Sequence, residues 1–289
     1  MANIKDLKKR IKSTKNTLKI TSAMKLVSAA KLSRAQSRIQ GLKPYTRELE
    51  SIVRTVAAIS QDYKHTFFEP KKSDYKILLV ISADKGLCGA YNSGLAKKVR
   101  KFLETTDSSK VKLYFVGKKV RDLISKEYNV GKTFKFEKLD PSIQEIKNIA
   151  NELAFQFRSG EVGEVYVAYN EFLSAINFNS DVKKLLPLTL TQASKEQSQK
   201  EFPFDFKYEP SAKEILDQLV PEVYSNSVQT ALYDAIASEH GARMSAMENA
   251  SKNSKEMTNS LTLKMNKLRQ AAITTELIEV VSGAESLNA

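Results

Sequence analysis

Residues 4 to 42 carry a series of apolar and small side chains whose spacing alternates between three and four residues. This spacing predicts a heptad seam held for more than five heptads, and such a seam must be covered by a second helix. An ordinary core helix remains an alternative, although few globular helices exceed about 25 residues. The seam positions are Ile4, Leu7, Ile11, Thr14, Leu18, Thr21, Lys25, Ser28, Leu32, Ala35, Ile39 and Leu42.

The seam resumes beyond Pro44, at Leu49, Val53 and Val56. We therefore expect one helix from Ile4 to about Ser60, with a possible kink at the proline. Several positions in the middle of the seam are small or polar, which allows a partner helix to come close but weakens the apolar contact.

A second long helix is expected to start at Ser211, a candidate N-cap with Glu214 three residues later. Pro221 is expected to interrupt it early. Beyond that proline about sixty residues can form one helix of roughly 90 Å. Because the two seams lie at opposite ends of the chain, they pair most simply as an antiparallel coiled coil. The face expected to pair consists of Ala246, Ala250, Ser254, Met257, Leu261, Met265, Leu268 and Ala272.

The middle of the chain alternates apolar runs typical of strands with helical stretches, which predicts a mostly parallel sheet with right-handed crossovers. The fold class is thus α/β with dominant α, a two-helix coiled coil plus a central Rossmann-like domain. The expected divisions are 1–60, 61–209 and 210–289. The strands are Tyr75–Ser82, Val111–Val116 and Glu164–Tyr169, the helices are Leu95–Leu103 and Ile143–Phe157, and Thr191–Lys200 is an exposed loop.

The residues indicate no catalytic, metal or cofactor site. The turn Ser82–Asn92 follows a strand but has neither of the two glycine-rich phosphate-binding patterns. His65 and His240 are far apart and lack neighbours at metal-ligand spacing. Cys88 is the single cysteine, so it forms no internal disulfide, suits a reducing compartment and is expected to be a buried thiol. An enzyme is the weaker class.

The net charge of +13 raises the question of an anionic partner. From Lys5 to Lys43 there are twelve Lys and Arg residues and one acid, Asp6. A nucleic acid, an anionic membrane surface, an acidic protein face or plain solvent could each meet this stretch. It contains no aromatic side chain to stack on a base, which disfavours nucleic acid. A coiled-coil adaptor or a basic nucleic-acid-binding protein remains the alternative function.

Nothing in the chain approaches 18 consecutive apolar residues, the length of a membrane span. The segment Met1–Lys19 is Lys-rich and amphipathic like a transit peptide. No apolar signal core or cleavage signature follows it, so we expect it to form the first turns of the mature fold.

Four segments resemble signatures of the ATP synthase γ-subunit family. They lie at both ends and in the middle of the chain, and Lys85 replaces an arginine that is usual in the family. The segments are Ile20–Gln36, ITSAMKLVSAAKLSRAQ; Ser82–Asn92, SADKGLCGAYN; Ala237–Ala250, ASEHGARMSAMENA; and Asn266–Ala284, NKLRQAAITTELIEVVSGA.

This resemblance implies the central rotor shaft of a rotary proton-translocating ATP synthase, which couples rotation of the membrane c-ring to conformational change in the catalytic β subunits. The implied partners are the α and β subunits of the ring, the ε subunit and the c-ring, with no nucleic acid and only peripheral contact with the membrane. ATP would be made or hydrolysed on β, and this chain would be non-catalytic.

The resemblance also implies contact residues. Met24, Lys25 and Arg243 match positions that meet acidic loops of β, Arg269 and Gln270 match a pair that contacts a β loop, and Thr274 and Glu276 lie on the next turn. The apolar tip would consist of Leu277, Ile278, Val280 and Val281. The regulatory cysteine pair of chloroplast relatives is absent, so thiol switching is not expected. The expected setting is the cytoplasmic face of a bacterial cell membrane.

Overall fold

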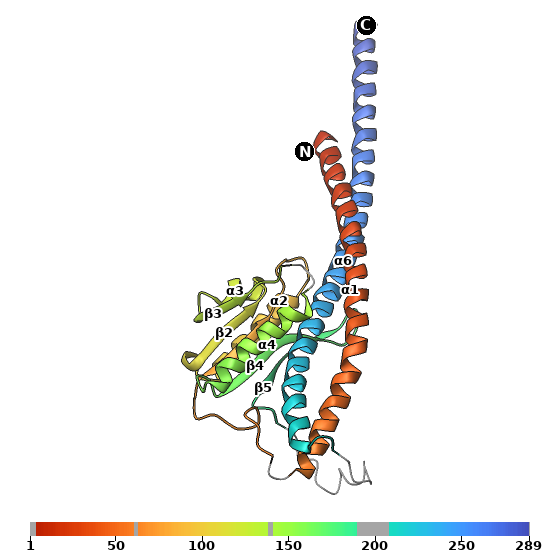
Figure 1. Cartoon of the computed structure of the whole chain (residues 1–289). Helices are drawn as coiled ribbons and strands as arrows, with labels where there is room; N and C mark the ends of the chain where they lie inside the picture. Colours follow the sequence, from red (N-terminus) through yellow and green to blue (C-terminus); the bar gives the residue numbers. More distant parts are fainter. Residues whose placement is uncertain (1–3, 61–62, 138–140, 190–207, 289) are drawn as a thin grey trace. The chain divides into compact units, whose positions relative to one another are not determined.

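The structure is a computed structural model that describes residues 4–60, 63–137, 141–189 and 208–288. The chain begins and ends with a very long helix, and the strands and shorter helices lie between these two in the sequence (Figure 1). The elements are α1 (Ile4–Ile59), β1 (Lys76–Ile81), α2 (Tyr91–Thr105), the short 3-10 helix η1 (Ser108–Lys110), β2 (Val111–Val116), α3 (Lys119–Ile124), β3 (Val130–Phe134), α4 (Ile143–Arg158), β4 (Glu164–Phe172), β5 (Phe178–Leu186) and α6 (Ala212–Asn288).

The chain forms two compact units, one made of residues 1–28 with 243–289 and one of residues 29–242. The first unit is a pair of helix segments from α1 and α6. Thr21 accepts a hydrogen bond from Ser251 at 2.7 Å, and Lys25 lies 2.6 Å from Glu248. Higher residue numbers on α1 thus face lower numbers on α6, which confirms the antiparallel pairing.

The predicted seam of α1 is confirmed, since all twelve of its positions are buried or half-buried. Leu49, Val53 and Val56, beyond Pro44, are buried too. Pro44 lies inside the helix, which ends at Ile59, close to the expected Ser60.

Helix α6 begins where predicted, and the backbone N–H of Glu214 donates to the Ser211 hydroxyl at 3.2 Å. The expected interruption at Pro221 is wrong, because α6 continues through it for 77 residues in all. A proline inside a helix costs about 3 kcal/mol, and apolar burial on both sides offsets that cost. Val220, Val223 and Tyr224 are all buried.

The predicted pairing face of α6 is buried or half-buried at seven of its eight positions. Met257 is the exception, since it is 56% exposed. Its sulfur nevertheless accepts a contact from the Thr14 hydroxyl of α1 at 3.9 Å, so Met257 lies at the edge of the pairing face. Thr258, which was not predicted, is buried like Ser254.

The second unit contains a five-stranded sheet of order β3-β2-β1-β4-β5. β1 pairs in parallel with β2 and β4, β2 pairs in parallel with β3, and β5 runs antiparallel to β4. This is the strand order of a doubly wound nucleotide-binding half with an antiparallel edge strand, so the Rossmann-like prediction is confirmed.

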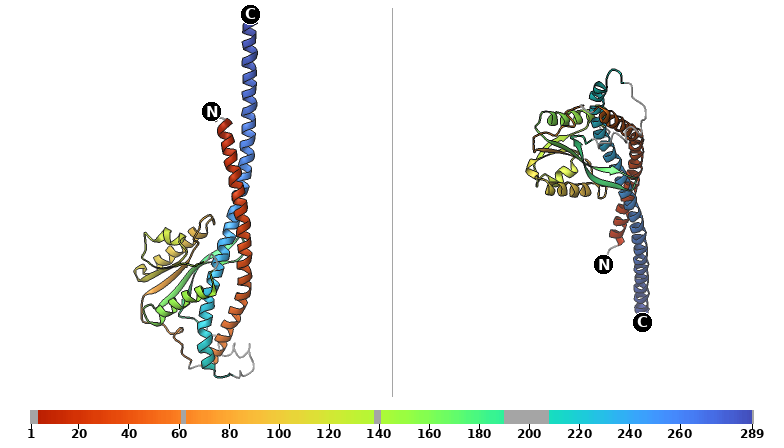
Figure 2. Two further views of the ribbon diagram at one scale, coloured as in Figure 1. Left: turned by 45° about the horizontal axis from the view of Figure 1, so that its top comes forward. Right: turned by 90° about the horizontal axis from the view of Figure 1, so that it is seen from below.

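Helices cover both faces of the sheet. Leu78 and Val80 of β1 pack with α2 and α3 in one buried cluster. Ile77, Leu79 and Ile81 alternate with them and are also buried. Figure 2 shows α4 on the face opposite α2. A strand buried on both faces reads as a continuous apolar run, which explains why β1 was easy to predict.

The two edge strands, β3 and β5, were not predicted. No residue of β3 is fully buried, and in β5 only Leu185 and Leu186 are. Their sequences, VGKTF and FNSDVKKLL, therefore carry too many polar and glycine residues to stand out as strands. The predicted loop Thr191–Lys200 lies outside the described residues.

Candidate functional site

The turn Ser82–Asn92 lies at the carboxyl end of β1, where doubly wound sheets bind nucleotides. The side chain of Asn92 bonds to two other residues of the turn. The amide oxygen of Asn92 accepts from the backbone N–H of Ala83 at 3.2 Å, and the amide nitrogen of Asn92 donates to the Cys88 sulfur at 3.1 Å. Leu87 takes a left-handed φ of 62°, so the turn is tight. These bonds hold the two ends of the turn together.

Cys88 is buried, as predicted, between Ala83 and Tyr91. His65 is half-buried among the rings of Tyr63, Phe67 and Phe68, and burial lowers the pKa of its imidazole. Over the described ranges, no three His, Cys, Asp or Glu side chains are arranged to hold a metal ion.

All seven predicted contact residues lie in the unit made of residues 1–28 and 243–289, but the structure separates them into two groups. Met24 is half-buried, Lys25 pairs with Glu248, and Arg243 is 8% exposed. Arg243 and Glu248 are about 7.5 Å apart along α6 at 1.5 Å per residue. We call these three residues the lower group.

The upper group consists of Arg269, Gln270, Thr274 and Glu276, all of which are exposed. It starts roughly 30 Å further along the helix than Glu248. Thr274 donates to the backbone carbonyl of Gln270 at 3.0 Å and so bonds within its own helix.

The upper group lies beyond the described part of α1. Thr21 meets Ser251 and Thr14 meets the sulfur of Met257, so by extrapolation the first turn of α1 is level with about residue 268. Beyond that level, no described residue of α1 lies beside α6 (Figure 1). Its end bears four exposed apolar side chains, Leu277, Ile278, Val280 and Val281, with exposures of 60%, 60%, 69% and 59%.

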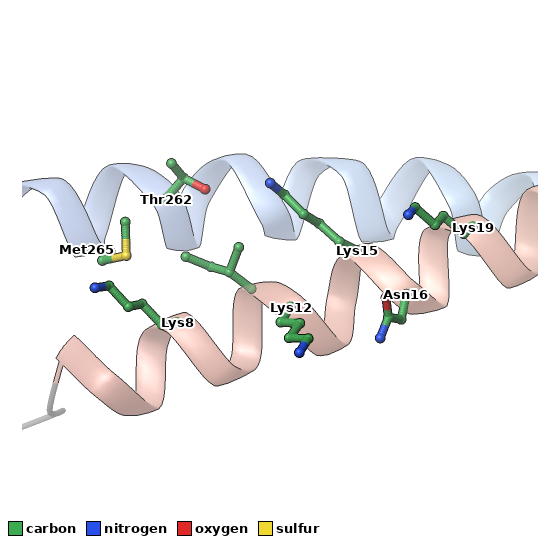
Figure 3. Close-up of a pocket in the computed structure, with 8 residues that line it drawn as sticks. Lys8, Lys12, Lys15, Asn16, Lys19, Thr262 and Met265 are labelled. Carbon is green, nitrogen blue, oxygen red and sulfur yellow. The ribbon is translucent and has the colours of Figure 1, made fainter.

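A basic groove of about 480 Å³ lies between the two helices of this unit (Figure 3). Four lysines from successive turns of α1 line it, together with Asn16, Thr262 and Met265. These lysines are Lys8, Lys12, Lys15 and Lys19. The basic stretch is visible in the sequence, but only the pairing of the helices turns part of it into a groove.

These features define a class: a two-helix coiled-coil protein with a Rossmann-like α/β domain. Comparison with known proteins gives the family. A family model described as ATP synthase matches residues 3–287. The chain is 40% identical to the ATP synthase gamma chain of Bdellovibrio bacteriovorus over 99% of both chains. It is 37% identical to that of Geobacter metallireducens, again over 99% of both.

Solved structures show the same similarity. The central stalk and c-ring structure of the Tetrahymena thermophila mitochondrial ATP synthase contains a chain that is 26% identical, with a TM-score of 0.59, covering 80% of this chain and 99% of that one. A rotor chain of the Euglena gracilis mitochondrial enzyme shares the fold at 18% identity, with a TM-score of 0.63 over 93% and 98% of the two chains. The chain belongs to the ATP synthase gamma-chain family. It is a non-catalytic subunit, and catalysis is carried out by other subunits.

The described helices contain no stretch long and apolar enough to cross a bilayer.

Proposed function

We infer that this chain is the central rotor shaft of a proton-translocating ATP synthase and couples rotation of a membrane c-ring to conformational change in the catalytic β subunits. The observation that carries the inference is the family match, which runs from residue 3 to residue 287 and so includes both long helices. An asymmetric shaft inside a ring can favour a different closed or open state in each surrounding subunit, because each angle offers each subunit a different face.

The exposed apolar end of α6 suits a shaft that turns in a sleeve. The side chains at this end are all apolar and make no directional bonds: Leu277, Ile278, Val280 and Val281. The free energy of their contact with a surrounding ring therefore changes little from one angular position to the next. Small differences between positions leave rotation unobstructed.

Charge supports an acidic protein partner for the same unit. In residues 1–28 and 243–289, 14 Lys and Arg residues stand against 6 Asp and Glu residues, a balance of +8 out of +13 for the whole chain. The basic groove is one concave part of this surface. Acidic loops of β are the partner we propose, since the α1 part of this surface has no aromatic side chain for stacking on nucleic acid bases.

Within this surface we assign roles to the two groups of contact residues. The lower group, Met24, Lys25 and Arg243, would meet acidic β loops at the level of the paired helices. In the upper group, the guanidinium fork of Arg269 and the amide of Gln270 would hold a polar β loop in one orientation. Thr274 and Glu276 would flank that contact.

We further propose α, β and ε subunits and a c-ring as partners, and a peripheral position on the cytoplasmic face of a bacterial cell membrane. The Tetrahymena relative is described as part of a central stalk with a c-ring, which supports the c-ring assignment. We also propose that the chain divides by function into a shaft helix, a sheet domain and a second shaft helix, at 1–60, 61–209 and 210–289.

The test is to purify the tagged chain from membranes and ask whether a nucleotide-hydrolysing ring and a c-ring co-elute with it in fixed proportion. We expect both to co-elute and the isolated chain to turn over no ATP. Recovery as a free chain, or as a complex with nucleic acid that resists high salt, would contradict the rotor function.

A further inference from the structure

Helix α6 is bound to the sheet domain at a point where most doubly wound sheets bind a ligand. Two hydroxyl groups form one hydrogen bond each, on consecutive turns of α6. The phenol of Tyr91, at the start of α2, donates to the backbone carbonyl of Ala235 in α6 at 3.0 Å. The hydroxyl of Ser238 in α6 donates to the backbone carbonyl of Asn170 in β4 at 3.0 Å.

Asn170 ties these two contacts together. Its side chain is fully buried, its amide nitrogen donates to the carbonyl of Tyr91 at 3.1 Å, and its amide oxygen accepts from Ser180 of β5 at 2.5 Å. β4 continues past Ala168, the last residue that pairs with β1. The carbonyl of Asn170 therefore lies beyond the β1 ladder, and Ser238 supplies a donor to it.

A third contact lies one turn further along α6. A Cβ atom at Gly241 would stand 2.8 Å from the carbonyl oxygen of Ala175 in the turn between β4 and β5. Only glycine permits that approach of backbone to helix. Ala235, Ser238 and Gly241 are three residues apart, so they share one face of the helix.

The position of this network is informative. The carboxyl ends of β1 and β4 flank the crevice in which doubly wound sheets hold their ligands. Here Tyr91 follows β1, Asn170 lies two residues before the end of β4, and α6 is bonded to both. The network also joins two of the family-like segments, Ser82–Asn92 and Ala237–Ala250.

We propose that Tyr91, Asn170 and Ser238 are positioning residues that fix α6 to the sheet domain so that torque passes between them. We call this network the α6 clamp. The inference rests on the proposed rotor function. If α6 could turn or slide against the sheet domain, part of each rotation would not be transmitted along the shaft. The clamp therefore affects the coupling of rotation to ATP synthesis and proton pumping, and not the chemistry of ATP itself.

The clamp is tested by removing both hydroxyls with little change in shape, in the double variant Tyr91→Phe with Ser238→Ala. Hydrogen exchange of the full chain is measured first. Each lost hydrogen bond is worth about 1 kcal/mol, so exchange of the α6 amides in 235–242 should rise roughly five- to thirtyfold. The matched control is Tyr45→Phe with Ser227→Ala. It removes a phenol bonded to Glu222 and a hydroxyl bonded to Val223, neither of which joins α6 to the sheet.

The second measurement uses the assembled enzyme in proton-tight vesicles. We expect the clamp variant to keep ATP hydrolysis within about twofold of wild type, while ATP-driven proton pumping and ATP synthesis fall by about fivefold or more. The control should change all three less than twofold. Restoring Ser238 alone should recover part of the coupling.

The outcomes separate the clamp from the rotor function. Parallel loss of hydrolysis and synthesis would mean that the residues only stabilise the fold, and faster exchange with normal coupling would mean that torque bypasses them. Both results overturn the clamp and leave the rotor function standing. Failure of the wild-type chain to assemble with a ring would instead refute the rotor function itself.

Discussion

Lys43 of α1 and Asp234 of α6 form an ion pair between the two helices, with 2.9 Å between Nζ and Oδ1. The side chain of Asp234 is only 1% exposed and that of Lys43 is 27% exposed. Burial raises the pKa of the Asp234 carboxyl, and the ammonium of Lys43 opposes that shift without cancelling it. Asp234 therefore contributes stability below its unfolded-state pKa, which is lost as pH rises through the folded-state pKa.

Lys43→Met should leave a buried carboxylate without its counter-charge. We expect the free energy of unfolding to fall by about 2 kcal/mol or more at pH 7. The loss should shrink towards pH 4, because the protonated carboxyl needs no cation. Urea unfolding at both pH values measures this. Lys25→Met breaks the exposed pair with Glu248 and should cost at most about 1 kcal/mol. An equal loss at both pH values would show that Asp234 does not depend on Lys43.

Leu32 tests the coiled-coil seam, since it is 4% exposed in α1. Leu32→Asp places a charge in an apolar contact and should cost at least about 3 kcal/mol. Leu32→Met keeps the volume and should cost less than about 1.5 kcal/mol. Thermal unfolding of the two variants gives the comparison. Equal midpoints would mean that position 32 does not pack against another helix.

The carboxyl of Glu164 should give folding stability the opposite pH dependence. Burial raises the pKa of its carboxyl, but hydrogen bonds from Lys184, Lys76 and Tyr166 outweigh that effect and lower the pKa to about 2. The folded state thus gains stability above the unfolded pKa and loses it as pH falls through the folded value.

Glu164→Gln should therefore lower the free energy of unfolding by about 1 to 3 kcal/mol at pH 7, and the difference from wild type should vanish between pH 5 and pH 2. Glu161→Gln is the control, because Glu161 is half exposed and lies 3.6 Å from Lys112. Denaturant titrations across this range measure both. A difference that stays constant with pH would rule out the low pKa of Glu164.

Arg269 and Gln270 test the upper group of contact residues. A charge-assisted contact of roughly 1.5 to 3 kcal/mol can report the shaft angle and still be released at each step. Arg269→Ala with Gln270→Ala should leave the complex assembled and lower ATP synthesis and hydrolysis together, by about tenfold. Arg269→Lys should be intermediate, since it keeps the charge and loses the fork.

Lys12→Ala is the control for that pair. Lys12 shares the basic groove with Lys8, Lys15 and Lys19, so its loss removes one of four similar charges and should have a much smaller effect. Both rates are measured on purified complexes. Wild-type rates in the double alanine variant would mean that Arg269 and Gln270 are a solvated part of the helix surface.

Several parts of the fold were predictable because their causes are local. The alternating spacing from Ile4 to Leu42 is a property of one helix face, and the apolar run of β1 reflects a strand covered on both sides. Ser211 could be recognised as a cap because it bonds to a backbone N–H only three residues away. The contact residues came only from resemblance to a family, since exposed Arg269 and Gln270 carry no physical signal in the sequence.

The sequence by itself therefore determined the two helices, the inner strands and the antiparallel pairing, because periodicity and short-range bonding decide them. The tertiary structure decided the rest. Pro221 stays helical because buried neighbours on both sides outweigh a missing hydrogen bond. Asn170 acquires its role from Tyr91, Ser180 and Ser238, which are brought to it by three different elements. Contacts between residues so distant in the chain depend on how the sheet and α6 pack, and no local pattern encodes them.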